Sequence, residues 1–234
     1  MGDKGEPVCG PGMVRIWAPE AFLEDEAFAP VVEINEQALG AMRRLALAGG
    51  EGGCAFLREL RPLWEDLDEA ALRRAARCPY ALLDADFAEP RRWRAARGYE
   101  VCDEQRPESI FEPAEAQPLA RLLLTYAWHL ARTRRFAARF VLGLSAANAE
   151  AIAASTLAQI TRVAESGREW LAPRWPQRLD AWRELLEAAR TGEPGALERA
   201  QLRGLQMLAG DAWRAAGESG RPAPGAGQAL PASR

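Results

Sequence analysis

The side chains that could do chemistry are few and lie far apart in this sequence. His129 is the only histidine, and no serine, cysteine or carboxylate pair lies at a spacing that would make it the base of a nucleophile. It falls on an apolar stripe, so we expect it to pack. Asp84 and Asp86 are the nearest approach to a catalytic pair, but aspartates at this spacing near a helix end are more typical of caps and turns.

The cysteines do not indicate a metal or redox site. They are Cys9, Cys54, Cys78 and Cys102. No two are spaced as C-x-x-C, the spacing typical of zinc ribbons and redox pairs. The sequence also has no glycine-rich phosphate loop and no cluster of metal ligands. We therefore expect no enzymatic activity, no cofactor and no bound metal.

The overall composition is that of a globular protein without a membrane span. The 234 residues are 48% hydrophobic, which is enough to bury a core in one or two domains. No segment approaches the roughly 20 apolar residues that a membrane helix needs, and the N-terminus lacks the apolar run of a signal peptide. We expect a cytoplasmic protein. The net charge of −3 excludes a general attraction to nucleic acid, so any DNA contact must be local.

Helical periodicity dominates the chain and predicts an all-α fold. Apolar residues recur at helical spacing over 33–48 and stop at Gly49 and Gly50. A further helix should end near Asp66, with a kink or late start at Pro62, and the next should begin at an Asp68 cap. Only 13–17 resembles a strand. No internal repeat is visible at the periods of solenoid proteins.

Changes in composition divide the chain into five parts. The N-terminal (1–12) and C-terminal (215–234) segments are rich in Gly, Pro and Ala and are predicted to be disordered tails. Residues 13–101 form a helical domain of unknown role. Residues 102–118 form an acidic linker whose prolines should break any helix. Residues 119–214 form a second helical domain.

The segment 119–140 is the most strongly patterned and is predicted to be one helix. Its packing stripe consists of Leu122, Tyr126, His129, Thr133, Phe136 and Phe140. A second stripe consists of Arg121, Arg132, Arg135 and Arg139. No Asp or Glu occurs between Glu115 and Glu150, so phosphates or an acidic partner could dock on the arginine face. The alternative is a solvated flank whose arginine stems cover apolar neighbours.

Two short helices are predicted after this segment. Gly143 can end the preceding helix, and Ser145 is suited to cap the next one. Thr156 and Gln159 have the spacing of a capping box for a further helix. The small residues of both helices allow close approach, which suits either a helix-turn-helix or a tight dimer interface.

The segment FVLGLSAANAEAIAASTLAQITRVAES, residues 140–166, resembles the D-subunit family of the bacterial flagellar master transcriptional regulator (FlhD). The resembling positions, aligned without a gap, are Phe140, Leu142, Gly143, Ala149, Ile152, Thr156, Leu157, Gln159, Ile160, Arg162 and 164–166. With looser similarity on both sides, the resemblance covers about 119–214. It implies an all-α, intertwined homodimer that joins a C-type subunit, binds promoter DNA and activates transcription. The helical N-terminal half is additional to this family.

The resemblance also implies roles for particular residues. The segment matching 145–166 is largely dimer core in the family, which argues against a helix-turn-helix there. The implied dimer-interface residues are Leu142, Leu144, Ile152, Leu157, Ile160 and Val163. The family's DNA-contacting helix-turn-helix would lie at about 178–207. Its candidate contacts, which join Arg132, Arg135 and Arg139, are Arg178, Arg183, Arg190, Arg199 and Arg203. A family cysteine that can bridge subunits aligns with Leu171, so no such disulfide is expected.

Two hypotheses of function follow from these patterns. The first is a dimeric, DNA-binding transcriptional activator with a C-type partner subunit, based on the resemblance and the acid-free arginine segment. The second is a protein-interaction module, an adaptor or anti-activator, that uses the same dimeric fold without contacting DNA. The negative net charge and the acidic N-terminal half favour the second hypothesis.

Overall fold

The structure is a computed structural model, and it describes residues 28–49, 54–89, 93, 109–166 and 171–219. These residues form ten helices and one two-stranded sheet, so the predicted all-α class is confirmed. The helices are α2 (Ala29–Ala48), α3 (Ala55–Glu59), α4 (Arg61–Asp66), α5 (Glu69–Ala76), α7 (Pro113–Thr133), α8 (Arg135–Leu142), α9 (Ala146–Ala154), α10 (Leu157–Ser166), α11 (Leu179–Thr191) and α12 (Pro194–Ser219). The strands are β1 (Leu83–Asp84) and β2 (Ala172–Pro173). The strand-like segment 13–17 and the predicted tail 1–12 lie outside the described residues.

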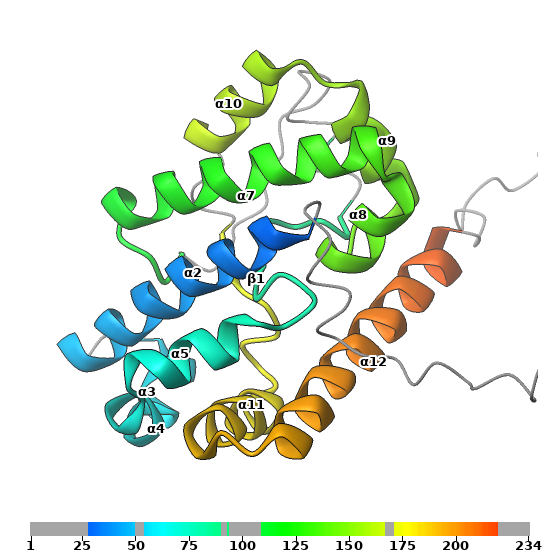
Figure 1. Cartoon of the computed structure of the whole chain (residues 1–234). Helices are drawn as coiled ribbons and strands as arrows, with labels where there is room; N and C mark the ends of the chain where they lie inside the picture. The colour runs from blue at the N-terminus through cyan, green and yellow to red at the C-terminus, as the bar shows by residue number, and fades with distance from the viewer. Residues whose placement is uncertain (1–27, 50–53, 90–92, 94–108, 167–170, 220–234) are drawn as a thin grey trace, which may run out of the picture.

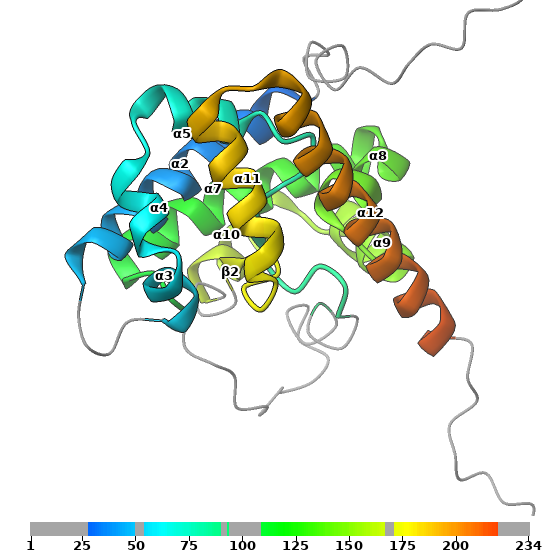
Figure 2. The same cartoon turned by 90° about the horizontal axis from the view of Figure 1, so that it is seen from below.

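The two long helices α2 and α7 pack against each other in the centre of the molecule (Figure 1). Helix α5 packs on α2, and α10 packs on α7. Helix α11 lies across α4 and α5, and α12 packs on α11 and extends away from it (Figure 2). One hydrophobic cluster includes residues from α2 through α12, so the N-terminal and C-terminal halves of the chain share a single core.

Several predicted helix ends are confirmed because they depend on local chemistry. Helix α2 ends at Gly49, whose φ of 49° places it in the left-handed region that glycine adopts readily. Pro62 lies in the first turn of α4, which is separated from α3 at Leu60. The carboxylate of Asp68 caps α5 by accepting the backbone N–H of Ala71 at 2.6 Å.

The predicted ends of α8, α9 and α10 are also confirmed. Gly143 ends α8 with a φ of 69°, and the hydroxyl of Ser145 caps α9 by accepting the N–H of Asn148 at 3.1 Å. The capping box at α10 is reciprocal. Gln159 N–H donates to the Thr156 hydroxyl at 3.2 Å, and Thr156 N–H donates to the Gln159 side chain at 2.8 Å.

The prediction of one continuous helix over 119–140 is wrong. The chain breaks at Arg134, whose φ of −142° and ψ of 65° are not helical, and α8 starts in a new direction. The predicted packing stripe is also wrong in its second half, because His129, Thr133, Phe136 and Phe140 are exposed. The buried face of α7 consists instead of Ala116, Leu119, Ala120, Leu123, Leu124, Tyr126, Ala127, Leu130 and Ala131. Helices α2, α9 and α10 cover this wider face, and the local sequence does not reveal their positions.

Two predicted irregular segments are partly helical. Residues 113–118 of the predicted linker belong to α7, although their prolines were expected to break any helix. Pro113 occupies the first turn, where the missing N–H costs nothing, and burial of the following turn holds the helix across Pro118. Helix α12 continues to Ser219, so residues 215–219 of the predicted C-terminal tail are helical as well.

The two strands were not predicted from the sequence. They pair antiparallel, with Leu83 opposite Pro173 and Asp84 opposite Ala172. Each has only two residues, which is too short for an alternating pattern to be recognised. Asp84 accepts the backbone N–H of Phe87 at 3.3 Å, and Asp86 has a φ of 56°, so this aspartate pair forms a tight turn after β1.

Candidate functional site

Helix α8 exposes arginine and phenylalanine side chains on one face. Arg135 and Phe136 are followed one turn later by Arg139 and Phe140, so the four share a side of the helix while the opposite side packs into the core. Phe136 is 80% exposed and Phe140 is 43% exposed. Arg132 stands in the last turn of α7, next to the break. We call these five residues the α7–α8 surface.

The arginines of the α7–α8 surface are only partly neutralised. Arg135 lies 3.4 Å from Glu150, but both side chains are exposed, and such a pair contributes about 1 kcal/mol or less. The guanidinium of Arg132 stacks over the ring of Trp128 at 4.9 Å, which fixes its position without cancelling its charge. Within the described part of the chain, neither Arg132 nor Arg139 is in an ion pair with a carboxylate.

The other predicted DNA contacts lie on or next to α11 and α12. The two helices are joined by a short turn at Gly192, and together they include the residues expected to form a helix-turn-helix, 178–207. Arg203 contacts Asp180 and lies 2.6 Å from Glu184, and Arg178 lies 3.4 Å from Asp180. The hydrogen bond from Arg178 lowers the pKa of Asp180. Arg178 and Arg203 are therefore engaged by carboxylates of this chain.

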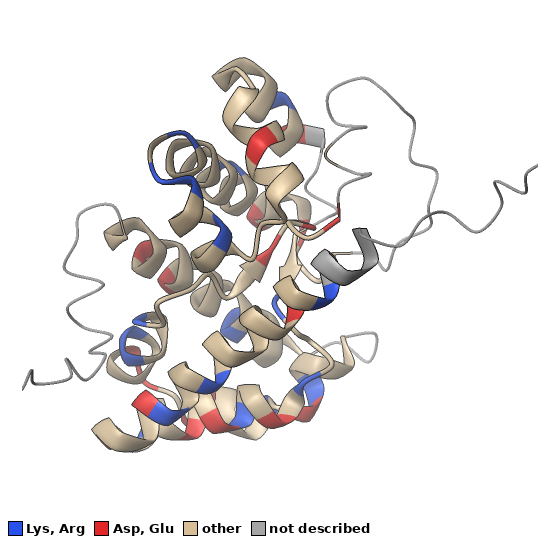
Figure 3. Ribbon diagram, turned by 90° about the vertical axis from the view of Figure 1, so that its right-hand side faces the viewer, with Lys and Arg blue, Asp and Glu red and all other residues tan. Residues whose placement is uncertain are grey.

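The remaining candidates of this group, Arg183, Arg190 and Arg199, are exposed. They are on α11 and α12 and not on α7 or α8. The structure therefore divides the eight predicted contacts between two places. On several helices positive and negative residues lie close to each other (Figure 3). The α7–α8 surface combines Arg132 and Arg139, which have no carboxylate partner among the described residues, with two exposed aromatic rings.

The predicted dimer-interface residues are mostly buried inside this one chain. Five have relative exposures of 6% or less: Leu142, Leu144, Ile152, Ile160 and Val163. Leu157, at the start of α10, is 47% exposed. Leu171, which aligns with the bridging cysteine of the family, is fully buried. The apolar contacts that the resemblance assigns to a second subunit are made here within the chain.

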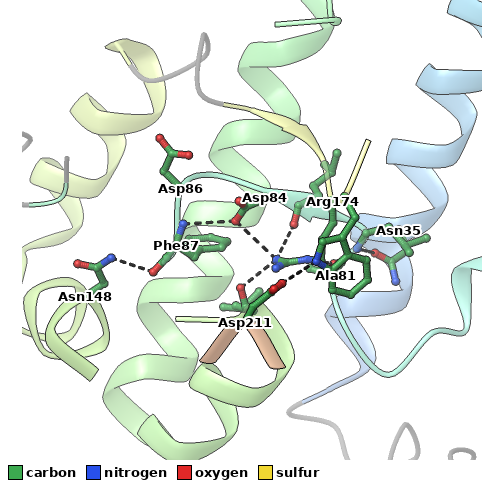
Figure 4. Close-up of polar contacts among 12 residues, drawn as sticks. Asn35, Ala81, Asp84, Asp86, Phe87, Asn148, Arg174 and Asp211 are labelled. Carbon is green, nitrogen blue, oxygen red and sulfur yellow. Dashed lines mark hydrogen bonds and ion pairs between the residues drawn. The ribbon is translucent and has the colours of Figure 1, made fainter. Parts of the chain in front are cut away.

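A buried arginine forms the polar centre of the fold. The guanidinium of Arg174, a residue only 5% exposed, donates to the backbone carbonyls of Ala81 at 2.7 Å, Leu83 at 2.9 Å and Leu142 at 2.9 Å (Figure 4). Burial lowers the pKa of Arg174, and the Asp84 carboxylate 3.7 Å away opposes this shift. Sequence reasoning missed this residue, because its partners are backbone groups of remote segments.

A cavity of about 400 Å³ opens beside this centre. Several polar side chains that line the cavity interact with one another. Asp211 accepts the indole N–H of Trp175 at 2.7 Å and lies 2.6 Å from Arg214. In the segments that the structure describes, no three His, Cys, Asp or Glu side chains are placed to hold a metal ion. Burial raises the pKa of the Cys78 thiol to about 12, so this thiol is not a nucleophile at neutral pH.

Comparisons with family models, curated proteins and solved structures found no match to this chain. Among the described residues, no single helix has the length and apolar character needed to cross a membrane; α8 and α9 meet these criteria only when counted together, and they are bent by 120°. The class that the structure shows is all-α.

Proposed function

We propose that this protein is a non-enzymatic subunit in transcription regulation that acts by binding a partner protein through the α7–α8 surface. The observation that carries the proposal is the exposure of Phe136, which is 80% accessible between arginines on a short helix. Aromatic residues and arginine are the residue types enriched in protein interfaces and in their energetic hot spots. A large exposed ring gains free energy when a partner covers it.

The chemistry of the surface indicates the kind of partner. Arg132 and Arg139 favour carboxylates, and the two phenylalanines favour apolar side chains, so the partner should present an acidic surface with an apolar centre. The resemblance of 140–166 to the flagellar D-subunit family supports a role in transcription, and in that family a C-type subunit is the protein partner. A cytoplasmic location follows from this proposal.

Replacing Arg132, Arg135 and Arg139 together by alanine is expected to weaken binding of the partner at least tenfold, which corresponds to a loss of about 1.4 kcal/mol of binding free energy. The matched control replaces Arg183, Arg190 and Arg199, which removes the same charge from α11 and α12. Tagged copies of both variants would be isolated from the protein's own bacterium and the bound proteins quantified. Retention of the partner by the first variant, or equal loss from both, would contradict the proposal.

The second candidate function is direct binding of promoter DNA, as the resemblance implies. Its specific support is the absence of Asp and Glu from 116–149 together with the exposure of Arg132 and Arg139. Mapping the tagged protein along the genome distinguishes the two candidates. Discrete peaks that disappear in the Arg132, Arg135 and Arg139 variant support DNA binding by this surface, and a flat profile with normal expression excludes it.

A further inference from the structure

The two halves of the chain contain the same series of elements. Residues 29–84 form a long helix, two short helices, a third helix and a two-residue strand, namely α2, α3, α4, α5 and β1. Residues 113–173 form α7, α8, α9, α10 and β2 in the same order. The packing is also the same, because the short helices and the third helix of each series contact the long helix of that series (Figure 1).

The buried faces of the two long helices correspond position by position. Every buried residue of α2 has a buried counterpart 85 residues later in α7, as with Val31 and Ala116. The α2 residues are Val31, Ile34, Asn35, Ala38, Leu39, Ala41, Met42 and Ala46. Their counterparts are Ala116, Leu119, Ala120, Leu123, Leu124, Tyr126, Ala127 and Ala131. The two helices therefore occupy equivalent positions in the fold although their residues differ.

A second correspondence, at a separation of 89 residues, covers the strands and the turns after them. Leu83 corresponds to Ala172 and Asp84 to Pro173. In the described segments the only non-glycine residues with positive φ are Asp86, at 56°, and Trp175, at 51°, which are also 89 residues apart. Such a conformation is uncommon outside glycine, so its occurrence at the same step after both strands indicates one shared turn.

Two tryptophans extend this correspondence beyond the turns. Trp93 and Trp182 are 89 residues apart, and both are almost fully buried. The indole N–H of Trp93 donates to the carbonyl of Asp86 at 3.2 Å, and that of Trp182 donates to the carbonyl of Arg174 at 2.8 Å. Each ring is thus held against the backbone of the turn that follows its own strand.

The two strands pair antiparallel, as a two-fold axis between equivalent strands requires. Leu83 pairs with Pro173, the counterpart of Asp84, and Asp84 pairs with Ala172, the counterpart of Leu83. Exchanging the two halves therefore leaves the pairing unchanged.

The chain also crosses from one half to the other after each strand. Beyond β1, the carbonyl of Phe87 accepts the side-chain N–H of Asn148, on α9, at 2.8 Å (Figure 4). Beyond β2, α11 packs on α4 and α5, where Arg74 donates to the carbonyl of Ala189 at 2.7 Å and Trp182 meets Phe56 edge to face. The segment that follows each strand thus packs on the opposite half, as in an intertwined dimer.

We propose that the two halves are copies of one helical unit, related by a pseudo-two-fold axis through β1 and β2, so that a single chain takes the place of a homodimer. The halves are not identical on the outside. Helix α3 of the first half is the counterpart of α8, and its Phe56 is buried against Trp182 of α11, whereas Phe136 of α8 stays exposed. Each chain therefore offers one α7–α8 surface and should bind one partner molecule. Of these statements, only the expected number of partner molecules per chain rests on the proposed function.

The mass of the unaltered full chain in solution tests the internal two-fold arrangement. Light scattering across micromolar concentrations is expected to give the mass of one chain, 25.6 kDa. Twice that mass would overturn the proposal. For the partner count, quantitative mass spectrometry of the captured complex should give equal numbers of the two chains. Two copies of this chain per partner would overturn that count. The mass of the free chain tests the internal two-fold arrangement by itself, whether or not a partner is found.

A cysteine pair across the axis provides a second test. Asp84→Cys and Ala172→Cys, combined in one chain, place thiols on directly paired residues. Under mild oxidation the two thiols are expected to form a disulfide within one chain. The denatured, non-reduced protein should then still have the mass of one chain. The matched control carries Asp84→Cys alone. Products linked between two chains, formed by the double variant and not by the control, would show strand exchange between subunits and overturn the proposal.

Discussion

Replacement of Arg174 by methionine is expected to lower the free energy of unfolding by about 3–5 kcal/mol, because three buried carbonyl groups lose their donor and each such loss costs about 1–3 kcal/mol. The carbonyls belong to Ala81, Leu83 and Leu142. They come from the turn before β1, from β1 itself and from the end of α8, so one side chain joins both halves of the chain. Methionine keeps most of the apolar stem but supplies no N–H group.

The measurement is urea unfolding followed by circular dichroism, with Arg178→Met as the control. Arg178 is four residues from Arg174, but its side chain is exposed and its partner is the exposed Asp180, so the control should lose about 1 kcal/mol or less. Similar losses in the two variants would show that the buried hydrogen bonds of Arg174 do not organise the fold.

Replacement of Asn35 by leucine is expected to cost about 3 kcal/mol, the second large effect. The Asn35 side chain is fully buried on α2. It donates to the carbonyls of Ala76 at 3.1 Å and Tyr80 at 2.9 Å, and it accepts the N–H of Leu82 at 2.8 Å. Leucine has the same number of side-chain heavy atoms and a larger volume, so the loss reports unsatisfied backbone groups and some overpacking, and no cavity is left.

Gln37→Leu on the same helix is the matched control for Asn35→Leu. Gln37 is exposed, and its side chain donates a 3.3 Å hydrogen bond to Glu33 one turn earlier. This amide-to-leucine change should therefore alter stability by about 0.5 kcal/mol or less. Thermal and urea unfolding of the two variants give the comparison. An Asn35→Leu protein as stable as the control would mean that the segment between α5 and β1 does not depend on this side chain.

The helix ends were predictable from the sequence because caps act over a few residues. Asp68, Ser145 and the Thr156–Gln159 pair make the contacts that their spacing indicates, and Gly49 and Gly143 adopt the left-handed conformation that ends a helix. These features need no knowledge of which helix packs on which. The boundaries of α5, α9 and α10 followed from them.

The packing of α7 was not predictable in the same way. A stripe through His129 and Phe136 has helical spacing, but the side that is buried depends on α2, which lies about 80 residues earlier in the chain. The break at Arg134 then turns Phe136 and Phe140 outward. The exposed aromatic rings, which carry the proposed function, are visible only once the three-dimensional arrangement is known.

The correspondence between the two halves was hidden for a related reason. Equivalent positions share burial but not residue type, as with Asn35 and Ala120 or Asp86 and Trp175. The separation also changes from 85 to 89 residues between the long helices and the strands. The three helices that follow the long helix are longer in the second half, and shorter connections offset only part of this increase. A search for repeated letters at one period cannot detect such a pattern.

Photo-crosslinking inside the cells that produce this protein tests the proposed function most directly. A photoreactive aromatic residue would replace Phe136, and the control would carry it at Leu47, a 39% exposed apolar position near the end of α2. We predict one abundant crosslinked protein at position 136 and none at position 47. Absence of a protein adduct at 136, or the same adducts at both positions, would contradict the assignment of the α7–α8 surface as the partner-binding site.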